Sequence, residues 1–247
     1  MQRDTLIAIG TGLGSAVLFL LVLSGNPIAL LLSYFGHLPL FLTGLWQGPK
    51  RLLVAAFAAC GALVLLGGLL PFTVFMVVFA GPAMLLTRMA LVVRKDQKGN
   101  IAFLPSGVVV SVMAIMVATV MIFVTGTLMA EGLDIQDFIA QFLNQMYSEM
   151  GVTMTSDVQG LIGMLQTYFP AIAAVSWLLM LFANAAIAQA ILVRAGKNLR
   201  PTPSMASFAL PGWSLFAFAL AGFTVGFADG SLAFMARNVA VVLAVPF

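Results

Sequence analysis

Apolar residues fill this chain in long runs that are separated by short polar or basic gaps. A membrane-spanning helix needs roughly 20 predominantly apolar residues to cross about 30 Å of hydrocarbon. By that measure the candidate spans are 5–23, 28–46, 52–70, 72–93, 105–129, 170–193, 211–228 and 232–247. The pattern predicts an all-α fold, a polytopic membrane helix bundle of about eight transmembrane helices. We expect residues 1–247 to form a single integral membrane domain.

Helix-breaking residues interrupt two of these runs. The sequence Gly36-His37-Leu38-Pro39 divides 28–46, which is therefore either one crossing or a pair of short helical pieces. Gly81-Pro82 lies in the middle of 72–93, where proline removes a backbone hydrogen bond and kinks the helix. Broken helices form binding sites in many transporters, although glycine and proline are also common in membrane helices generally.

Residues 131–168 lie between the fifth and sixth runs and are amphipathic. Apolar side chains follow an i, i+3, i+4, i+7 spacing over four turns: Ile135, Phe138, Ile139, Phe142, Leu143, Met146, Tyr147 and Met150. Ser156 is predicted to cap a second helix that runs towards Pro170. We expect an external amphipathic helix that lies on the membrane surface or caps the bundle, with or without a role as a lid over a ligand.

Charge predicts the orientation of the bundle. The stretch from Ile101 to Val193 contains acids but no Lys, Arg or His. The bases cluster instead in three short gaps: Lys50-Arg51, Arg94-Lys95-Lys98 and Arg194-Lys197-Arg200. Because basic residues beside membrane spans stay on the cytoplasmic side, the N-terminus is predicted to be cytoplasmic and 131–168 external. We expect a multi-pass protein of the bacterial inner membrane.

Composition removes several classes of function. Hydrophobic residues make up 62% of the chain and charged residues only 8%, against about 25% in soluble domains. The sequence lacks a basic face interleaved with aromatic residues, so nucleic-acid binding is not expected. The single Cys60 and single His37 argue against a metal cluster, and no cofactor motif or Walker loop is present. Since no nucleophile has a plausible base, we do not expect an enzyme.

The C-terminal run ends at Val245-Pro246-Phe247 without a basic or polar tail. This ending predicts either that neighbouring helices stabilise the last span or that the natural chain continues beyond Phe247. We favour the longer natural chain.

Three side chains within apolar runs are candidate substrate-binding residues, because polar groups in hydrocarbon are costly. Asn184 could instead form a hydrogen bond to a neighbouring helix and have no contact with a substrate. Arg237 could instead lie at the level of the outer lipid headgroups, before the membrane-spanning part of its run. His37 lies where the broken helix leaves backbone polar groups without helical partners, and such backbone survives only where protein buries it or it lines a cavity.

The first run carries a row of small residues, Ala8, Gly12 and Ala16, at four-residue spacing on one face. Gly10 and Gly14 repeat on nearly the opposite face. Small-x-x-x-small rows let helix backbones approach closely. The row therefore predicts either packing within this bundle or docking against a partner subunit.

Several motifs resemble those of the YybS-like family of bacterial membrane proteins: Gly44-Leu45-Trp46-Gln47-Gly48-Pro49, Ser176-Trp177 with Asn184 and Ala188-Gln189, Asn198-Leu199-Arg200-Pro201, Leu210-Pro211-Gly212-Trp213 and Arg237-Asn238. The first half of that family is distantly similar to the substrate-binding subunits of energy-coupling factor transporters. The resemblance implies that Ala8, Gly12 and Ala16 dock a coupling subunit that works with ATPases. The chain departs from that subunit type in its external segment and its extra spans.

The leading hypothesis is a substrate-binding membrane subunit of a small-molecule, vitamin-like transporter. The alternative is a non-enzymatic membrane scaffold in envelope biogenesis or cell division, whose working surface would be the external helix and whose partners would be envelope proteins. A site enclosed among the helices favours the first hypothesis, and a fully packed interior favours the second.

Overall fold

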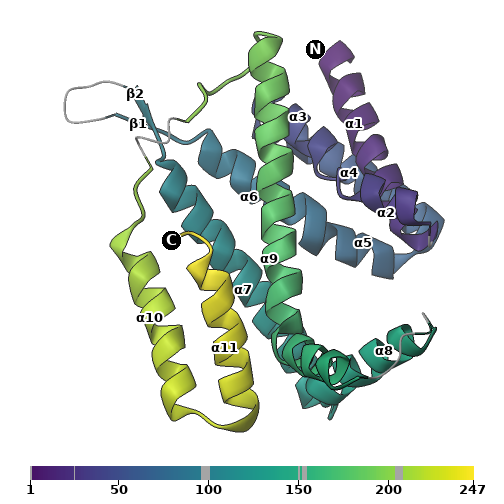
Figure 1. Cartoon of the computed structure of the whole chain (residues 1–247). Coiled ribbons are helices and arrows are strands. Elements are labelled where there is room, and N and C mark those ends of the chain that lie inside the picture. Colours follow the sequence, from purple (N-terminus) through teal and green to yellow (C-terminus); the bar gives the residue numbers. More distant parts are fainter. Residues whose placement is uncertain (1, 25, 96–100, 150, 152–154, 204–207) are drawn as a thin grey trace. The chain divides into compact units, whose positions relative to one another are not determined.

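The computed structural model describes residues 2–24, 26–95, 101–149, 151, 155–203 and 208–247. These residues form helices and one short antiparallel hairpin of strands β1 (Val93–Lys95) and β2 (Ile101–Phe103) (Figure 1). The helices are α1 (Gln2–Leu20), α2 (Pro27–Ser33), α3 (Leu38–Gln47), α4 (Pro49–Gly67), α5 (Leu69–Phe75), α6 (Gly81–Ala90), α7 (Ser106–Ala130), α8 (Ile135–Glu149), α9 (Ser156–Arg194), α10 (Gly212–Phe227) and α11 (Gly230–Ala244). A 3-10 turn, Leu21–Ser24, follows α1, and a π-helical turn, Met76–Ala80, joins α5 to α6.

The prediction of an all-α membrane helix bundle is confirmed. Within the described residues, six helical segments are long and apolar enough to cross a membrane: Gln2–Leu20, Pro27–Gln47, Pro49–Gly67, Leu69–Ala90, Ser106–Ala130 and Ser156–Arg194. The last two predicted spans form shorter apolar helices, α10 with 16 residues and α11 with 15. At 1.5 Å per residue, such helices reach only about 22–24 Å.

The helices group into two compact units, and two helices pass from one to the other. Unit 1 comprises residues 1–109 and 179–209, and unit 2 comprises 110–178 and 210–247. Two of the three boundaries therefore fall inside α7 and α9, and the third lies between residues 209 and 210, just before α10.

In unit 1, α1 packs along α4 through a row of small side chains. Ala8 and Ala16 are buried there, and a Cβ atom on Gly12 would overlap the backbone carbonyl of Ala55. The two helices are thus too close for any side chain at position 12. On the opposite face of α1, Gly10 and Gly14 have open space around them.

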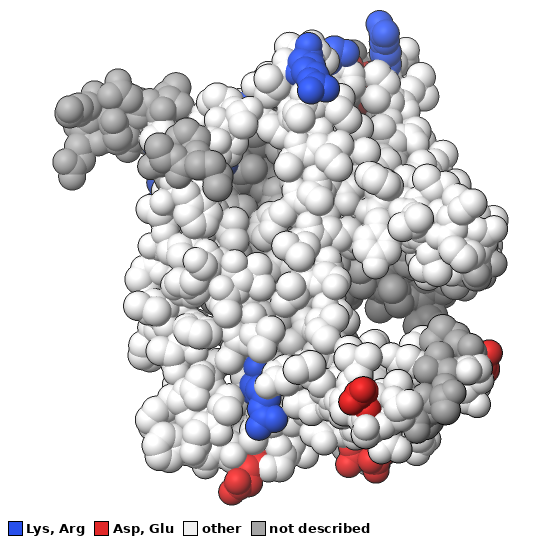
Figure 2. Space-filling view, in the orientation of Figure 1, with Lys and Arg blue, Asp and Glu red and all other residues white. Residues whose placement is uncertain are grey.

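Two of the basic gaps, Lys50-Arg51 and 194–200, lie at one end of unit 1. The Leu199 N–H donates to the Leu45 carbonyl (3.3 Å), and the Lys197 ammonium lies 4.4 Å from the ring centre of Trp46. Arg51, in the first turns of α4, donates to Thr5, in the first turns of α1. Figure 2 shows Lys and Arg side chains gathered where α1 begins and α9 ends. The start of α1 and these two basic gaps therefore share one end of this unit.

In unit 2, α10 and α11 form an antiparallel pair (Figure 1), and α8 packs against α9 and α11. The predicted amphipathic helix is present, and Asp134 caps it by accepting from the N–H groups of Gln136 (2.9 Å) and Asp137 (3.2 Å). One apolar row of α8 is buried with a residue from α9 and one from α11: Ile135, Ile139, Leu143, Ile162 and Phe234. The other predicted apolar residues of this face include Phe138 and Phe142, which are exposed. Met150 lies outside the described residues.

The prediction for residues 156–193 was wrong in two details. The second external helix and the sixth span are one continuous helix, α9, with 39 residues and Pro170 inside it. The cap is Thr155, whose hydroxyl accepts from the Val158 N–H at 3.4 Å, and Ser156 is already helical. Pro170 does not end the helix because a side chain from α11 pairs the backbone groups beside it, as described below.

Candidate functional site at two helix interruptions

The run 28–46 consists of two helical pieces. Helices α2 and α3 are joined by a tight turn, residues 34–37, that lies midway along Pro27–Gln47. The N–H groups of Tyr34, Phe35 and Gly36 each donate to the carbonyl three residues earlier. Pro39 then sits in the first turn of α3, where proline is tolerated because the helix needs no N–H there. The interruption follows directly from the Gly36-to-Pro39 sequence.

The span Leu69–Ala90 is also interrupted near its middle, by the π-helical turn Met76–Ala80. This turn immediately precedes Gly81-Pro82, at the position where the sequence predicted a kink. Pro82 has no N–H to donate to the carbonyl four residues earlier, which belongs to Val78. A wider turn and a side-chain donor accommodate this change in the backbone pairing.

That donor is His37. Its Nε2 lies 2.8 Å from the Val78 carbonyl oxygen. Since a carbonyl only accepts, Nε2 must carry the proton. The imidazole also stacks on Phe79, with ring centres 4.2 Å apart and planes 16° apart. His37 thus joins the interruption of one span to the interruption of another.

Side chains from two further helices pair the carbonyls of the 34–37 turn. The Ser15 hydroxyl, from α1, donates to the Gly36 carbonyl at 2.5 Å. The Asn184 amide, from α9, donates to the Tyr34 carbonyl at 2.8 Å and to the Met180 carbonyl of its own helix at 2.9 Å. Carbonyl groups without partners are costly in hydrocarbon, so these bonds explain how the turn persists inside the span.

Close packing makes the position of the turn specific. Phe79 contacts Phe75 in a stacked arrangement and Phe19 in an edge arrangement. A Cβ atom on Gly36 would come within 2.6 Å of the Phe79 ring. Glycine at position 36 therefore allows the turn to lie directly against the aromatic cluster.

Two atoms of this junction have no hydrogen-bond partner among the described residues: Nδ1 of His37 and Oδ1 of Asn184. His37 is 0% exposed and Asn184 is 3% exposed. Both residues were predicted as site residues, and both lie at the same turn of unit 1. Unpaired buried polar atoms cost about 1–3 kcal/mol each, so their retention requires a reason.

The third predicted site residue, Arg237, belongs to unit 2. It is partly buried on α11, and within the described residues no hydrogen bond or ion pair holds its guanidinium. Its neighbour Asn238 is the residue with defined contacts. Asn238 Nδ2 donates to the Thr167 carbonyl (3.0 Å), and its Oδ1 accepts from the Ala171 N–H (3.0 Å). These two backbone groups would pair with each other in a regular helix, so Asn238 bridges the α9 backbone beside Pro170.

The small-residue row of α1 has a partner within the chain. Ala8, Gly12 and Ala16 are covered by α4 as described above, which corresponds to the packing alternative for this row. A partner subunit could reach the row only by displacing α4.

In the sequence, Arg200 stood out only as part of a basic gap and of one motif, with no predicted contact. It is 9% exposed, and its guanidinium donates to the carbonyls of Ala90 (3.0 Å) and Leu104 (2.9 Å). Burial lowers the pKa of this guanidinium from its usual value. The Arg200 carbonyl in turn accepts from Gln189 and Asn198. The residue fastens the loop after α9 to the end of α6 and to the hairpin, which is a structural role.

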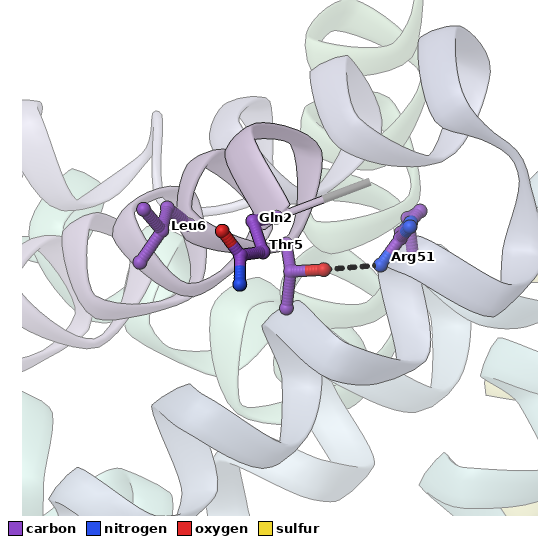
Figure 3. A pocket seen from close by; sticks show the side chains of 4 residues that line it. All are labelled: Gln2, Thr5, Leu6 and Arg51. Atoms are coloured by element: carbon purple, nitrogen blue, oxygen red, sulfur yellow. Dashed lines mark hydrogen bonds between the residues drawn. The ribbon is translucent and has the colours of Figure 1, made fainter.

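A surface pocket opens beside the start of α1 (Figure 3). Gln2, Thr5, Leu6 and Arg51 line it, and its volume is about 610 Å³. Its polar wall is formed by Arg51, which donates to the Thr5 hydroxyl at 2.5 Å. None of the predicted substrate-binding residues lines this pocket. Within the described part of the chain, no three His, Cys, Asp or Glu side chains come together to hold a metal ion.

The six full-length apolar helices define a polytopic helical membrane protein. The chain belongs to the family described as "Predicted membrane protein (DUF2232)", whose family model matches residues 15–247. No curated protein and no solved structure matches the chain.

Proposed function

We propose that this protein is a substrate-binding membrane subunit of a small-molecule transporter. The observation that supports the proposal best is the meeting of two interrupted spans at His37, close to a second buried polar side chain, Asn184. His37 lies midway between Pro27 and Gln47, and the π-helical turn lies near the middle of Leu69–Ala90. Transporters commonly place their substrate sites near the bilayer midplane, between discontinuous helices.

The alternative explanation for polar groups at this depth is packing alone. Packing accounts for the bonds from Ser15, His37 and Asn184 to backbone carbonyls. It leaves His37 Nδ1 and Asn184 Oδ1 without partners among the described residues, as it does the side-chain polar atoms of Gln47 and Thr87. His37 and Asn184 differ from those two residues in bonding to the interrupted segments of two spans. A bound molecule that pairs both atoms gives them a function.

The proposed orientation follows from the basic end of unit 1. Arg51, Lys197 and Arg200 lie at that end together with the start of α1. Since basic residues are retained on the cytoplasmic side, we place this end in the cytoplasm of a bacterium and the protein in its inner membrane. The absence of Lys, Arg and His between Ile101 and Val193 gives residues 131–168 the outer side in this proposal.

This orientation is tested by single cysteines in a Cys60→Ser background. A cysteine at Ser148 should react with a membrane-impermeant maleimide in intact spheroplasts. A cysteine at Lys50, which is also exposed, should react only after lysis. The reverse labelling pattern contradicts the proposed orientation.

Transport would require energy from another protein, because the sequence has no Walker loop. We propose a coupling subunit with ATPases as the partner. Affinity purification from membranes under mild detergent, followed by mass spectrometry, tests for such subunits. Repeated recovery of the chain without an ATPase-linked membrane protein counts against this part of the proposal.

The substrate role is tested by thermal unfolding of the purified chain in detergent with a panel of small metabolites. We expect at least one compound to raise the unfolding temperature, and the increase to be lost in His37→Phe and Asn184→Leu. The matched control is Thr125→Val, a buried polar residue of unit 2 whose hydroxyl bonds only within α7. No stabilising compound, or one whose effect survives both site substitutions, contradicts the proposal.

One observation favours the scaffold alternative. Phe138 and Phe142 are 62% and 53% exposed on α8, one turn apart, and could contact an envelope protein. Deleting the whole helix would not test this, because Ile139 and Leu143 are part of the core of unit 2. The sharper variant is Phe138→Ser with Phe142→Ser. The scaffold would be favoured if this variant failed to rescue a deletion strain that the unchanged protein rescues, and if no ligand bound at His37.

A further inference from the structure

We infer that the ligand of the His37–Asn184 junction is a hydrogen-bond donor, uncharged or positively charged, and not an anion. The inference rests on the proposed function and specifies its substrate class. It follows from which atoms of the junction are already used and which are not.

The unpaired atom of His37 is an acceptor. Nε2 donates its proton to the Val78 carbonyl, so in the neutral imidazole Nδ1 carries a lone pair and no hydrogen. A second proton would create a charge on a side chain that is 0% exposed, at a position where Nδ1 has no partner among the described residues. Burying an unpaired charge in this way is strongly unfavourable. The neutral ring therefore offers a lone pair to any bound molecule.

The unpaired atom of Asn184 is also an acceptor. Its side chain has two near neighbours, the carbonyls of Tyr34 and Met180, and both accept. The amide must therefore point its NH₂ group at these carbonyls, which leaves Oδ1 unpaired. Turning the amide over would place oxygen against oxygen twice. The orientation of Asn184 is fixed by its surroundings.

The remaining groups at the junction suit the same class of ligand. The hydroxyl of Ser15 is committed to the Gly36 carbonyl, so it is not a ready donor to an anion. Phe19, Phe75 and Phe79 cluster beside His37, and aromatic faces attract cations and apolar rings. None of these residues carries a positive charge. A carboxylate or phosphate placed here would face two acceptors and no charged donor.

Binding requires a local movement, because both unpaired atoms are nearly inaccessible in this structure. The 34–37 turn and the π-helical turn are the places where the two spans lack regular helical pairing, so they are where such a movement costs least. A ligand that reaches His37 Nδ1 must separate the turn from its neighbours. This agrees with a site that closes around its substrate.

The test uses three probes of one size and shape: benzamidine, benzamide and benzoate. Benzamidine is a cationic donor, benzamide a neutral donor and acceptor, and benzoate an anionic acceptor. Binding to the purified full chain in nanodiscs is measured by isothermal titration calorimetry. We expect benzamidine and benzamide to bind at least about tenfold more tightly than benzoate, since only they satisfy both acceptors. Equal or tighter binding of benzoate overturns the inference.

Two substitutions connect binding to the site. His37→Phe removes both ring nitrogens, and Asn184→Leu removes the amide together with its unpaired Oδ1. We expect benzamidine affinity to fall about tenfold or more in both variants and to be unchanged in Thr125→Val. If His37→Phe fails to fold, Asn184→Leu alone decides the question.

The outcomes separate the inference from the proposed function. Benzoate binding that depends on His37 and Asn184 refutes the substrate class and leaves the substrate-binding role in place. Binding of all three probes unaffected by either substitution, or no binding by any probe, refutes both.

Discussion

Asn184 and Asn238 are two buried asparagines on apolar helices, and they differ in one atom. Both are at most 3% exposed, and each NH₂ group donates to two carbonyls, one in its own helix and one in another segment. The Oδ1 of Asn238 accepts from the Ala171 N–H, whereas the Oδ1 of Asn184 accepts from no described residue. Both polar atoms of the Asn238 side chain are therefore hydrogen-bonded, whereas Asn184 has only its NH₂ group hydrogen-bonded.

The difference comes from the kind of interruption that each asparagine meets. Beside Pro170, the backbone presents both an N–H, on Ala171, and a carbonyl, on Thr167, to Asn238. At the 34–37 turn, the N–H groups of Tyr34 and Phe35 already donate to the Leu31 and Leu32 carbonyls of α2, so Asn184 meets only carbonyls. Asn238 therefore has a structural role, and the unpaired Oδ1 of Asn184 is the atom to which our proposal gives a ligand.

The largest effect is expected for Asn238→Ala. The substitution leaves the Ala171 N–H and the Thr167 carbonyl without their present partner, so the free energy of unfolding should fall by about 1–3 kcal/mol. SDS-induced unfolding in mixed micelles, followed by tryptophan fluorescence, measures this loss. Thr125→Val, which removes only a hydroxyl bonded within its own helix, is the control. A loss no greater than the control would remove the structural role of Asn238.

A double-mutant cycle with Pro170→Ala measures the cause of that loss. Alanine restores an N–H at position 170 and permits α9 to straighten, so that the Ala171 N–H can bond the Thr167 carbonyl directly. Asn238→Ala should then cost less than half of what it costs beside proline, a coupling of about 1 kcal/mol. Strictly additive effects would show that Asn238 does not compensate for Pro170.

Much of the fold followed from hydrophobic run length, because a span of about 20 apolar residues is close to a geometric requirement of the bilayer. The two units did not follow from it, since two of their three boundaries fall inside α7 and α9, within apolar runs. The split of the α8 apolar face was also not predictable. Helical spacing places Phe138 and Ile139 on one broad face, and only contacts with Ile162 and Phe234 decide which of the two is buried.

The site was predictable in part. His37 and Asn184 stood out as polar residues within apolar runs, and the structure places both at one turn. That the two residues meet at one turn could not be predicted, because hydrogen bonds between segments far apart in sequence leave no periodic pattern. The same holds for Ser15, a small residue in a helix rich in them. Pro82 was the one available clue, since it removes the N–H that would pair the carbonyl four residues earlier.

Asn184→Ala should cost less than Asn238→Ala. It leaves one carbonyl, that of Tyr34, without its donor, and it also removes an atom that was already unpaired. The expected loss in the free energy of unfolding is about 1 kcal/mol. The same micelle titration ranks the two variants. If Asn184→Ala proves as costly as Asn238→Ala, the unpaired Oδ1 has a structural partner, and the contrast between the two asparagines fails.

The smallest effect is expected for Ser15→Ala, which removes the other side-chain donor to the same turn. Hydrogen bonds between membrane helices average about 0.6 kcal/mol by double-mutant cycles, so a loss of that order is expected. Thr119→Val, an exposed residue whose hydroxyl bonds only its own helix, should cost less and is the control. Ser15 and Asn184 pair different carbonyls, those of Gly36 and Tyr34, so Ser15→Ala and Asn184→Ala should be additive if the turn is held rigidly. A combined loss larger than the sum would mean that the turn opens when both donors are gone, which is the movement that ligand entry requires.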